Sequence, residues 1–238
     1  MSIVGNIFRA IRTMLGGDSC MICGGYADDT THHICTQCRL SIPLTRYYLD
    51  TDNPIKDRFS SFVPIQRASA LYFYDSDPLW REVIHRTKYR GQWRLAYVMG
   101  RWYGEVLRDT ELYDDVDVII PIPLHPLKTI KRGYNQSAYI GEGMAREMGV
   151  KVDRRSVRRV KNNPSQTTKS GSSRWDNVEQ IFRVVEPERL RGKHILIVDD
   201  VLTTGATISS CIAAIYAAVP DCRISVVALA TPSDHKLM

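Results

Sequence analysis

The stretch that decides the fold is His194–Thr207, which reads HILIVDDVLTTGAT. Ile195–Val198 form a short apolar run, which predicts a buried strand. Two acids follow it, Asp199 and Asp200, then a threonine-rich turn, and then a helical stretch through Ser209–Ala218. Ligands of open α/β sheets bind beyond the carboxyl ends of the strands. The sequence therefore predicts a ligand site at this turn.

The composition of the turn is suited to a phosphate group. A helix N-terminus presents unpaired N–H groups and partial positive charge to an anion, and Gly205 lets the backbone approach closely. The hydroxyls of Thr203, Thr204 and Thr207 can donate to phosphate oxygens. The two acids would repel phosphate, so we expect them to face ribose hydroxyls with a magnesium ion nearby. Taken singly, these residues also suit a helix cap or a solvated strand edge.

The rest of the chain alternates strand and helix signals. This order predicts βαβ units and a parallel sheet. No GxxxxGK[ST] loop is present, which disfavours a P-loop nucleotide hydrolase. The expected strands are Ala68–Tyr74, Val116–Ile120, Ile195–Val198 and Ile224–Leu229, and the expected helices are Pro78–Arg90, Trp93–Leu107, Gln136–Met148 and Ser209–Ala218.

A proline-stiffened turn, Pro121–Pro126, follows the second strand and leads into a cationic stretch. Such a loop fits a pyrophosphate, because Lys and Arg neutralise its charge. We predict that Pro123, Leu124, Lys131 and Arg132 contact it; a surface loop with solvated cations is the alternative.

The polar stretch 162–173, NNPSQTTKSGSS, is long enough to be a lid over the site. Lys169 and Arg174 would close it over the pyrophosphate and exclude water, and we count them as candidate catalytic residues with Asp199 and Asp200.

A separate cluster of cysteines lies near the N-terminus. Cys20, Cys23, Cys35 and Cys38 form two CxxC pairs. Two such pairs can place four thiolates around a structural zinc ion. A redox pair or disulfides are the alternatives, but the N-terminus lacks a signal-peptide cleavage site, so we expect a cytoplasmic protein with reduced thiols.

The sequence resembles a known family at these motifs. Ile195–Thr207 resembles the loop of type I phosphoribosyltransferases that binds 5-phosphoribosyl-1-pyrophosphate (PRPP). More narrowly, the chain resembles the competence protein F family (ComF-like, GntX-like). That likeness rests on CMIC and CTQC, HRTKYRG, PIPLHPLKTIKRGYNQ, Gln166 to Phe182 and the PRPP loop.

The resemblance implies an α/β core with a parallel twisted sheet flanked by helices, at 65–238, after an N-terminal helix and zinc module at 1–64. It implies that Asp199 and Asp200 bind the ribose hydroxyls and that Thr203, Thr204, Gly205, Ala206 and Thr207 surround the 5′-phosphate. The implied reaction transfers a phosphoribosyl group to a nucleophile with release of pyrophosphate, in the presence of magnesium.

The family association also implies a link to DNA uptake. The net charge of +6 and the basic run Lys151–Lys161 suit a polyanion, and a protein that handles single-stranded DNA without catalysis is the alternative function. Partners of that kind would be single-stranded DNA or competence proteins. The acceptor nucleophile, catalytic activity and oligomeric state stay open at this point.

Overall fold

A computed structural model describes residues 19–27, 33–60, 63–161 and 181–233 of the chain. Its strands are β1 (Ala68–Phe73), β2 (Val118–Pro121), β3 (Lys151–Val152), β4 (Val157–Arg159), β5 (Phe182–Val184), β6 (His194–Val201) and β7 (Arg223–Thr231). Its helices are α2 (Thr36–Ser41), α3 (Pro54–Ser60), α4 (Pro78–Tyr89), α5 (Trp93–Arg108), α6 (Pro126–Arg132), α7 (Gln136–Met148) and α8 (Ala206–Ala218), with 3-10 turns η1 (Tyr47–Leu49) and η2 (Pro187–Arg189).

The main sheet is parallel throughout and has the order β1-β7-β6-β2-β3. Its central strands are buried on both faces, which is why β6 and β7 read as almost continuous apolar runs. The predicted α/β class and parallel sheet are confirmed. One detail differs: β6 continues through Asp199 and Asp200, because its ladder with β7 extends to Val201, which pairs with Ala230.

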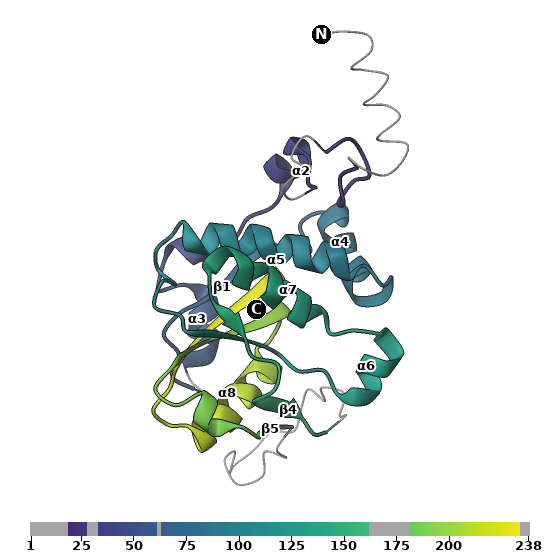
Figure 1. The fold of residues 1–238 in the computed structure, drawn as a ribbon. Coiled ribbons are helices and arrows are strands. Elements are labelled where there is room, and N and C mark those ends of the chain that lie inside the picture. Colours follow the sequence, from purple (N-terminus) through teal and green to yellow (C-terminus); the bar gives the residue numbers. More distant parts are fainter. Residues whose placement is uncertain (1–18, 28–32, 61–62, 162–180, 234–238) are drawn as a thin grey trace, which may run out of the picture.

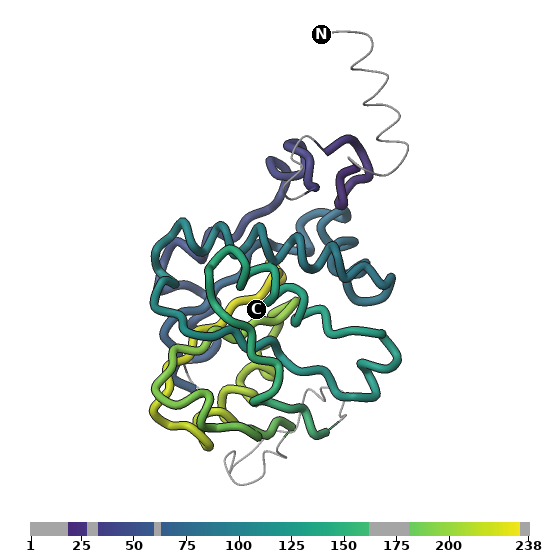
Figure 2. The backbone as a smooth tube through the Cα atoms, in the orientation of Figure 1, coloured from purple at the N-terminus to yellow at the C-terminus, as the bar shows by residue number. Residues whose placement is uncertain are grey.

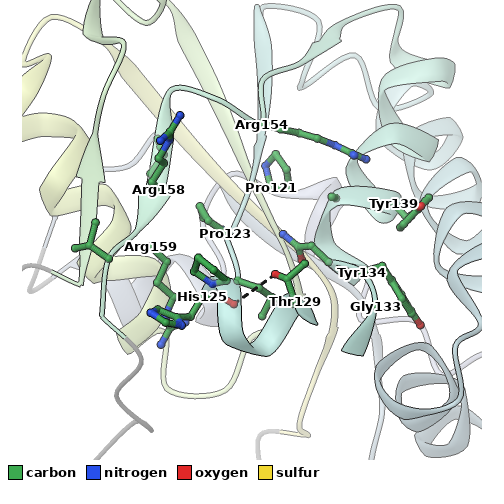
Figure 3. A pocket seen from close by; sticks show the side chains of 16 residues that line it. Pro121, Pro123, His125, Thr129, Gly133, Tyr134, Tyr139, Arg154, Arg158 and Arg159 are labelled. Carbon is green, nitrogen blue, oxygen red and sulfur yellow. Dashed lines mark hydrogen bonds between the residues drawn. The ribbon is translucent and has the colours of Figure 1, made fainter. Parts of the chain in front are cut away.

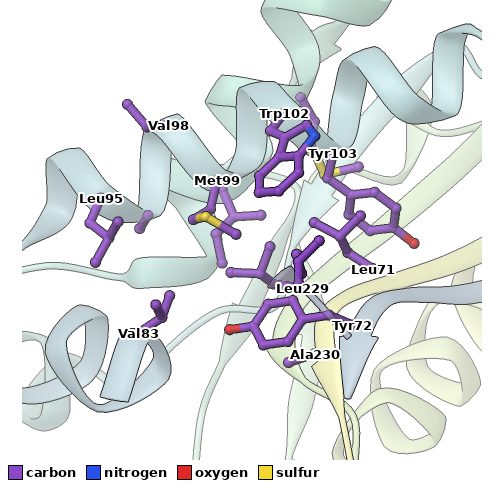
Figure 4. Packing of buried hydrophobic residues seen from close by; sticks show 14 of the residues in the cluster. Leu71, Tyr72, Val83, Leu95, Val98, Met99, Trp102, Tyr103, Leu229 and Ala230 are labelled. Atoms are coloured by element: carbon purple, nitrogen blue, oxygen red, sulfur yellow. The ribbon is translucent and has the colours of Figure 1, made fainter. Parts of the chain in front are cut away.

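Helices cover the two faces of this sheet in separate layers (Figure 1). On one face α4, α5 and α7 pack over Leu196 and Val198, and Figure 4 shows part of this core. On the other face α3 and α8 pack over Ile195 and Ile197. The strand pair β4–β5 is antiparallel and separate from the main sheet.

The helices α5 and α7 cross at very short range. A Cβ atom added at Gly100 or Gly143 would lie 2.2 Å or 2.1 Å from a backbone oxygen of the other helix. Glycine at these positions therefore lets the two backbones touch. This crossing fixes the start of α7, which lies at the candidate site.

The cysteine-containing segment lies beside α4 and α5 (Figure 2, purple). Arg86 of α4 donates to the carbonyl oxygens of Ile22 and Met21 at 2.7 and 2.5 Å. Further along, α3 contributes Ile55 and Phe59 to the core under α8. The division of the chain at residue 64 stays a prediction.

Candidate functional site

The acidic pair at the end of β6 is surrounded by polar groups from two helices. Asp200 is only 4% exposed, and its Oδ2 accepts from Gln136 Nε2 at 2.6 Å. Its Oδ1 lies 3.3 Å from Lys88 Nζ, at the end of α4. Asp199 Oδ1 accepts from Ser137 Oγ at 2.9 Å. Hence the two carboxylates are tied to the start of α7 and the end of α4.

Burial raises the pKa of Asp199 to about 7, and the adjacent charge of Asp200 acts in the same direction. Backbone and Ser137 hydrogen bonds oppose that rise. A carboxylate pair this close together carries negative charge that is only partly compensated by Lys88. A bound cation, or hydroxyl groups of a ligand that donate hydrogen bonds to the carboxylates, would offset this negative charge.

The turn after β6 leads directly into α8. Thr203 and Thr204 are exposed, Gly205 has φ +77°, and α8 begins at once at Ala206. The Thr203 carbonyl oxygen accepts from Arg58 of α3 at 3.1 Å, which fixes the loop. Thr204 Oγ1 accepts from the Ala206 N–H at 3.4 Å, and the N–H groups that follow at the start of α8 lack intrahelical acceptors.

The proline turn and α6 lie beside the start of α7. Arg132 donates to Gln136 Oε1, and its guanidinium lies 5.5 Å from the Tyr89 ring centroid. Arg132 therefore bonds to Gln136, whose side-chain amide in turn donates to Asp200. Lys131 is exposed and forms no ion pair or hydrogen bond within the described part of the chain. The predicted lid residues Lys169 and Arg174 lie outside the described residues.

A cavity of about 700 Å³ opens beside the proline turn (Figure 3). Pro123 and Leu124 line it, together with Tyr134, Tyr139 and Arg154 on one side and Arg158 and Arg159 on the other. Two of the residues predicted to contact pyrophosphate thus face this cavity.

The four cysteine sulfur atoms of the N-terminal segment lie within 4.8 Å of one another. The Sγ atoms of Cys23 and Cys35 are 3.7 Å apart, close to the ~3.8 Å that tetrahedral zinc–sulfur bonds of about 2.3 Å would give. Burial opposes ionisation of Cys20, but backbone N–H groups of Cys23, Cys35 and Ile22 bring its pKa down to about 7. The donor set therefore fits a closed zinc site.

Some of these contacts had a signal in the sequence and others had none. The acids and the threonine turn are contiguous and were predicted together. Lys88 stood out only as a cation near the end of a predicted helix, and Ser137 only as part of a helical stretch. Their role depends on α4 and α7 meeting over β6, which no local pattern encodes.

Comparison with known sequences adds to this geometry. Residues 135–237 match the phosphoribosyl transferase domain family. The segment starts at the cap of α7 and includes the acids, the loop, α8 and β7. The class of protein is therefore a phosphoribosyltransferase-like α/β protein with an added four-cysteine module.

The chain is also 31% identical over 193 residues to the DNA utilization protein YhgH of Escherichia coli K12, covering 80% of each chain. It is 28% identical over 131 residues to competence protein F of Haemophilus influenzae, covering 53% of this chain and 57% of that one. With competence protein ComFC of Bacillus subtilis it shares 25% identity over 191 residues, 79% of this chain and 74% of the other. The chain belongs to the competence protein F family.

Among the helices in the described ranges, none combines the length and apolar character required to cross a membrane.

Proposed function

We propose that this protein binds PRPP at the β6–α8 loop and transfers its phosphoribosyl group to a nucleophile. The observation that carries the proposal is that the acidic pair Asp199 and Asp200 lies at the end of β6, and that a short turn ending in Gly205 joins this pair to the N-terminus of α8. Carboxylates suit ribose hydroxyls and helix N–H groups suit the 5′-phosphate. Thr203, Thr204 and Gly205 lie between these two sites, with Ala206 and Thr207 opening the helix.

In the proposed reaction the bond between the anomeric carbon and pyrophosphate breaks, and its electron pair leaves with the pyrophosphate. The nucleophile forms the new bond to that carbon and loses its proton. Bound magnesium would neutralise charge on the leaving group. Arg132 and Lys131, with Pro123 and Leu124 shaping the turn, are our candidates for binding pyrophosphate, and Lys169 and Arg174 for covering it.

We further propose that the four cysteines bind a structural zinc ion, that residues 1–64 form the zinc-binding module, and that residues 65–238 form the transferase-like domain. The printed names of the relatives, DNA utilization and competence proteins, support a role for this chain in DNA use. The second candidate function is a protein that handles single-stranded nucleic acid without catalysis. The cations of β4 and β5 favour it.

The test is calorimetric titration of PRPP with magnesium into the zinc-loaded protein. We expect saturable binding that the D199N/D200N double substitution abolishes. Asp114→Asn is the matched control, because Asp114 is an exposed carboxylate at the opposite end of the sheet. Release of pyrophosphate would then be screened with candidate acceptors.

Equal binding by the wild-type and D199N/D200N proteins would refute the assignment of the acids. If the folded wild-type protein bound no PRPP, the nucleic-acid function would lead instead.

A further inference from the structure

Lys88, near the end of α4, reaches the acidic pair but has no role in the function proposed above. Its Nζ atom lies 3.3 Å from Asp200 Oδ1, and its side chain is 23% exposed, compared with 6% for that of Asp200. Asp200 is its one ion-pair partner among the described residues. Because a lysine ammonium carries three N–H donors, this contact leaves donors for a ligand on the exposed side.

The end of α4 is held in place directly before Lys88. Arg86 donates to two carbonyl oxygens of the cysteine-containing segment. The carbonyl oxygen of Thr87 accepts from the Tyr134 hydroxyl, in the turn before α7. The backbone next to Lys88 is therefore tied to two separate parts of the fold, and its side chain extends from a fixed position.

A second cation is linked to Asp200. Gln136 Nε2 donates to Asp200 Oδ2 at 2.6 Å, and Gln136 Oε1 accepts from Arg132. The Arg132 guanidinium also lies 5.5 Å from the ring centroid of Tyr89, the residue after Lys88. Lys88 and Arg132 thus approach the same carboxylate from α4 and α6, one directly and the other through Gln136.

The surroundings of Arg132 carry excess positive charge. Within the described part of the chain, Arg132 forms no ion pair with an acid. Burial lowers the pKa of Lys128, also on α6, and the charges of Arg159 and Arg132 lower it further. A pyrophosphate would offset this excess, because it brings several negative charges and many acceptor oxygens in a small volume.

We infer that Lys88 is a further pyrophosphate-binding residue, whose ammonium acts together with the Arg132 guanidinium. Asp200 and Gln136 position the two cations. The identity of the ligand rests on the proposed function, to which the inference adds a cation from outside the proline turn and α6. As the bond to the anomeric carbon breaks, Lys88 compensates the negative charge that develops on the leaving pyrophosphate.

The test is calorimetric titration of the zinc-loaded full chain with PRPP and magnesium, with pyrophosphate and magnesium, and with ribose 5-phosphate. Lys88→Gln removes the charge but keeps an amide that can donate to Asp200, and Lys88→Arg keeps a cation. Lys151→Gln is the matched control, because Lys151 is an exposed lysine at the start of β3, at the opposite end of the sheet from the acids. Urea unfolding checks that each variant is folded.

We expect K88Q to weaken PRPP and pyrophosphate by about tenfold or more, the size of one lost charge-assisted hydrogen bond, and to change ribose 5-phosphate by less than about twofold. K88R should recover most of the lost affinity, and K151Q should bind all three ligands as wild type does. A lysine that only balanced the charge of the acids would affect ribose 5-phosphate as much as pyrophosphate.

A second measurement needs no variant. Pyrophosphate with magnesium should slow modification of Lys88 by an amine-reactive reagent in the wild-type protein, followed by mass spectrometry, and should leave Lys151 unprotected. Ribose 5-phosphate should protect neither lysine.

Equal pyrophosphate binding by K88Q and K151Q, equal losses of pyrophosphate and ribose 5-phosphate in K88Q, or no protection of Lys88 would overturn the inference. If D199N/D200N loses PRPP while K88Q binds it as wild type does, this inference fails and the proposed function stands. A folded wild-type protein that binds neither PRPP nor pyrophosphate would refute both.

Discussion

At the scale of single residues, Gly205 determines the shape of the candidate phosphate loop. Its φ of +77° turns the chain from β6 into α8. A Cβ atom there would meet the Phe59 ring at 3.2 Å, so the loop also packs against α3 without room for a side chain. Both constraints act on the position that presents the N–H groups of α8.

Replacing Gly205 with alanine should destabilise the protein by about 2 kcal/mol or more, because the residue would be strained in the left-handed region and crowded against Phe59. The control is Gly133→Ala, which has a similar φ of +85° but nothing within 4 Å of the added Cβ atom. It should cost about 1 kcal/mol. Urea unfolding of both variants measures the difference. Equal losses would show that contact with Phe59 does not matter.

Among single residues, the sequence predicts the site residues that lie next to one another in the chain. Asp199, Asp200 and the glycine turn stand together, and their chemistry can be read in order. Lys88 and Ser137 could not be assigned, because each reaches the acids from a helix placed by tertiary packing. Arg158 was visible only as part of a basic run, and its position opposite Arg183 depends on a strand pair that the sequence did not reveal.

At the scale of elements, the crossing of α5 and α7 positions the site. The start of α7 carries Gln136 and Ser137, and the crossing below it is close enough to exclude any side chain at Gly143. The helix is capped by Asn135, whose Oδ1 accepts from the Ser137 N–H at 3.1 Å. A shift of α7 would therefore move both contacts to the acids.

We expect Gly143→Ala to destabilise the fold by about 3 kcal/mol or more, because its Cβ atom would lie 2.1 Å from the Tyr97 carbonyl oxygen and backbone cannot yield as a side chain does. The control in the same helix is Gly141→Ala. Its added Cβ would lie 3.2 Å from a methyl group of Ile119, which can adjust. Thermal and urea unfolding should separate the two variants clearly. A G143A protein as stable as G141A would mean that the helices can separate at little cost.

Long periodic elements were predicted well and short ones were not. Gln136–Met148 matches α7 at both ends, because Asn135 caps it and Gly149 ends it. The strand predicted at Val116–Ile120 is observed at Val118–Pro121, since only those residues pair with β6. The pair β4–β5 was not predicted, because strands of 3 residues are too short to carry a periodic signal.

At the scale of the whole molecule, the four-cysteine segment shares a hydrophobic core with the sheet. Cys20 and Cys38 belong to the same buried cluster as Trp80 and Trp102. Arg86 of α4 links the two parts, because it donates to the carbonyl oxygens of Met21 and Ile22, between Cys20 and Cys23. Lys88, on the same helix, pairs with Asp200. The segment is thus attached to the element that reaches the acidic pair.

Removal of zinc should therefore destabilise the whole protein rather than one module alone. We expect a chelator to lower the melting temperature by about 5–10 °C in a single transition, and added zinc, but not magnesium, to restore it, because metal binding to such sites contributes directly to folding. Arg86→Ala should speed zinc release to a chromophoric chelator by about tenfold or more, since it removes the hydrogen bonds to the carbonyl oxygens of Met21 and Ile22, each of about 1 kcal/mol. Arg90→Ala is its control, because that exposed arginine pairs with Glu82 at the surface and with no other residue in the described part of the chain. Two separate transitions, or release from R86A at the rate seen with R90A, would show that the segment folds and binds its metal independently of α4.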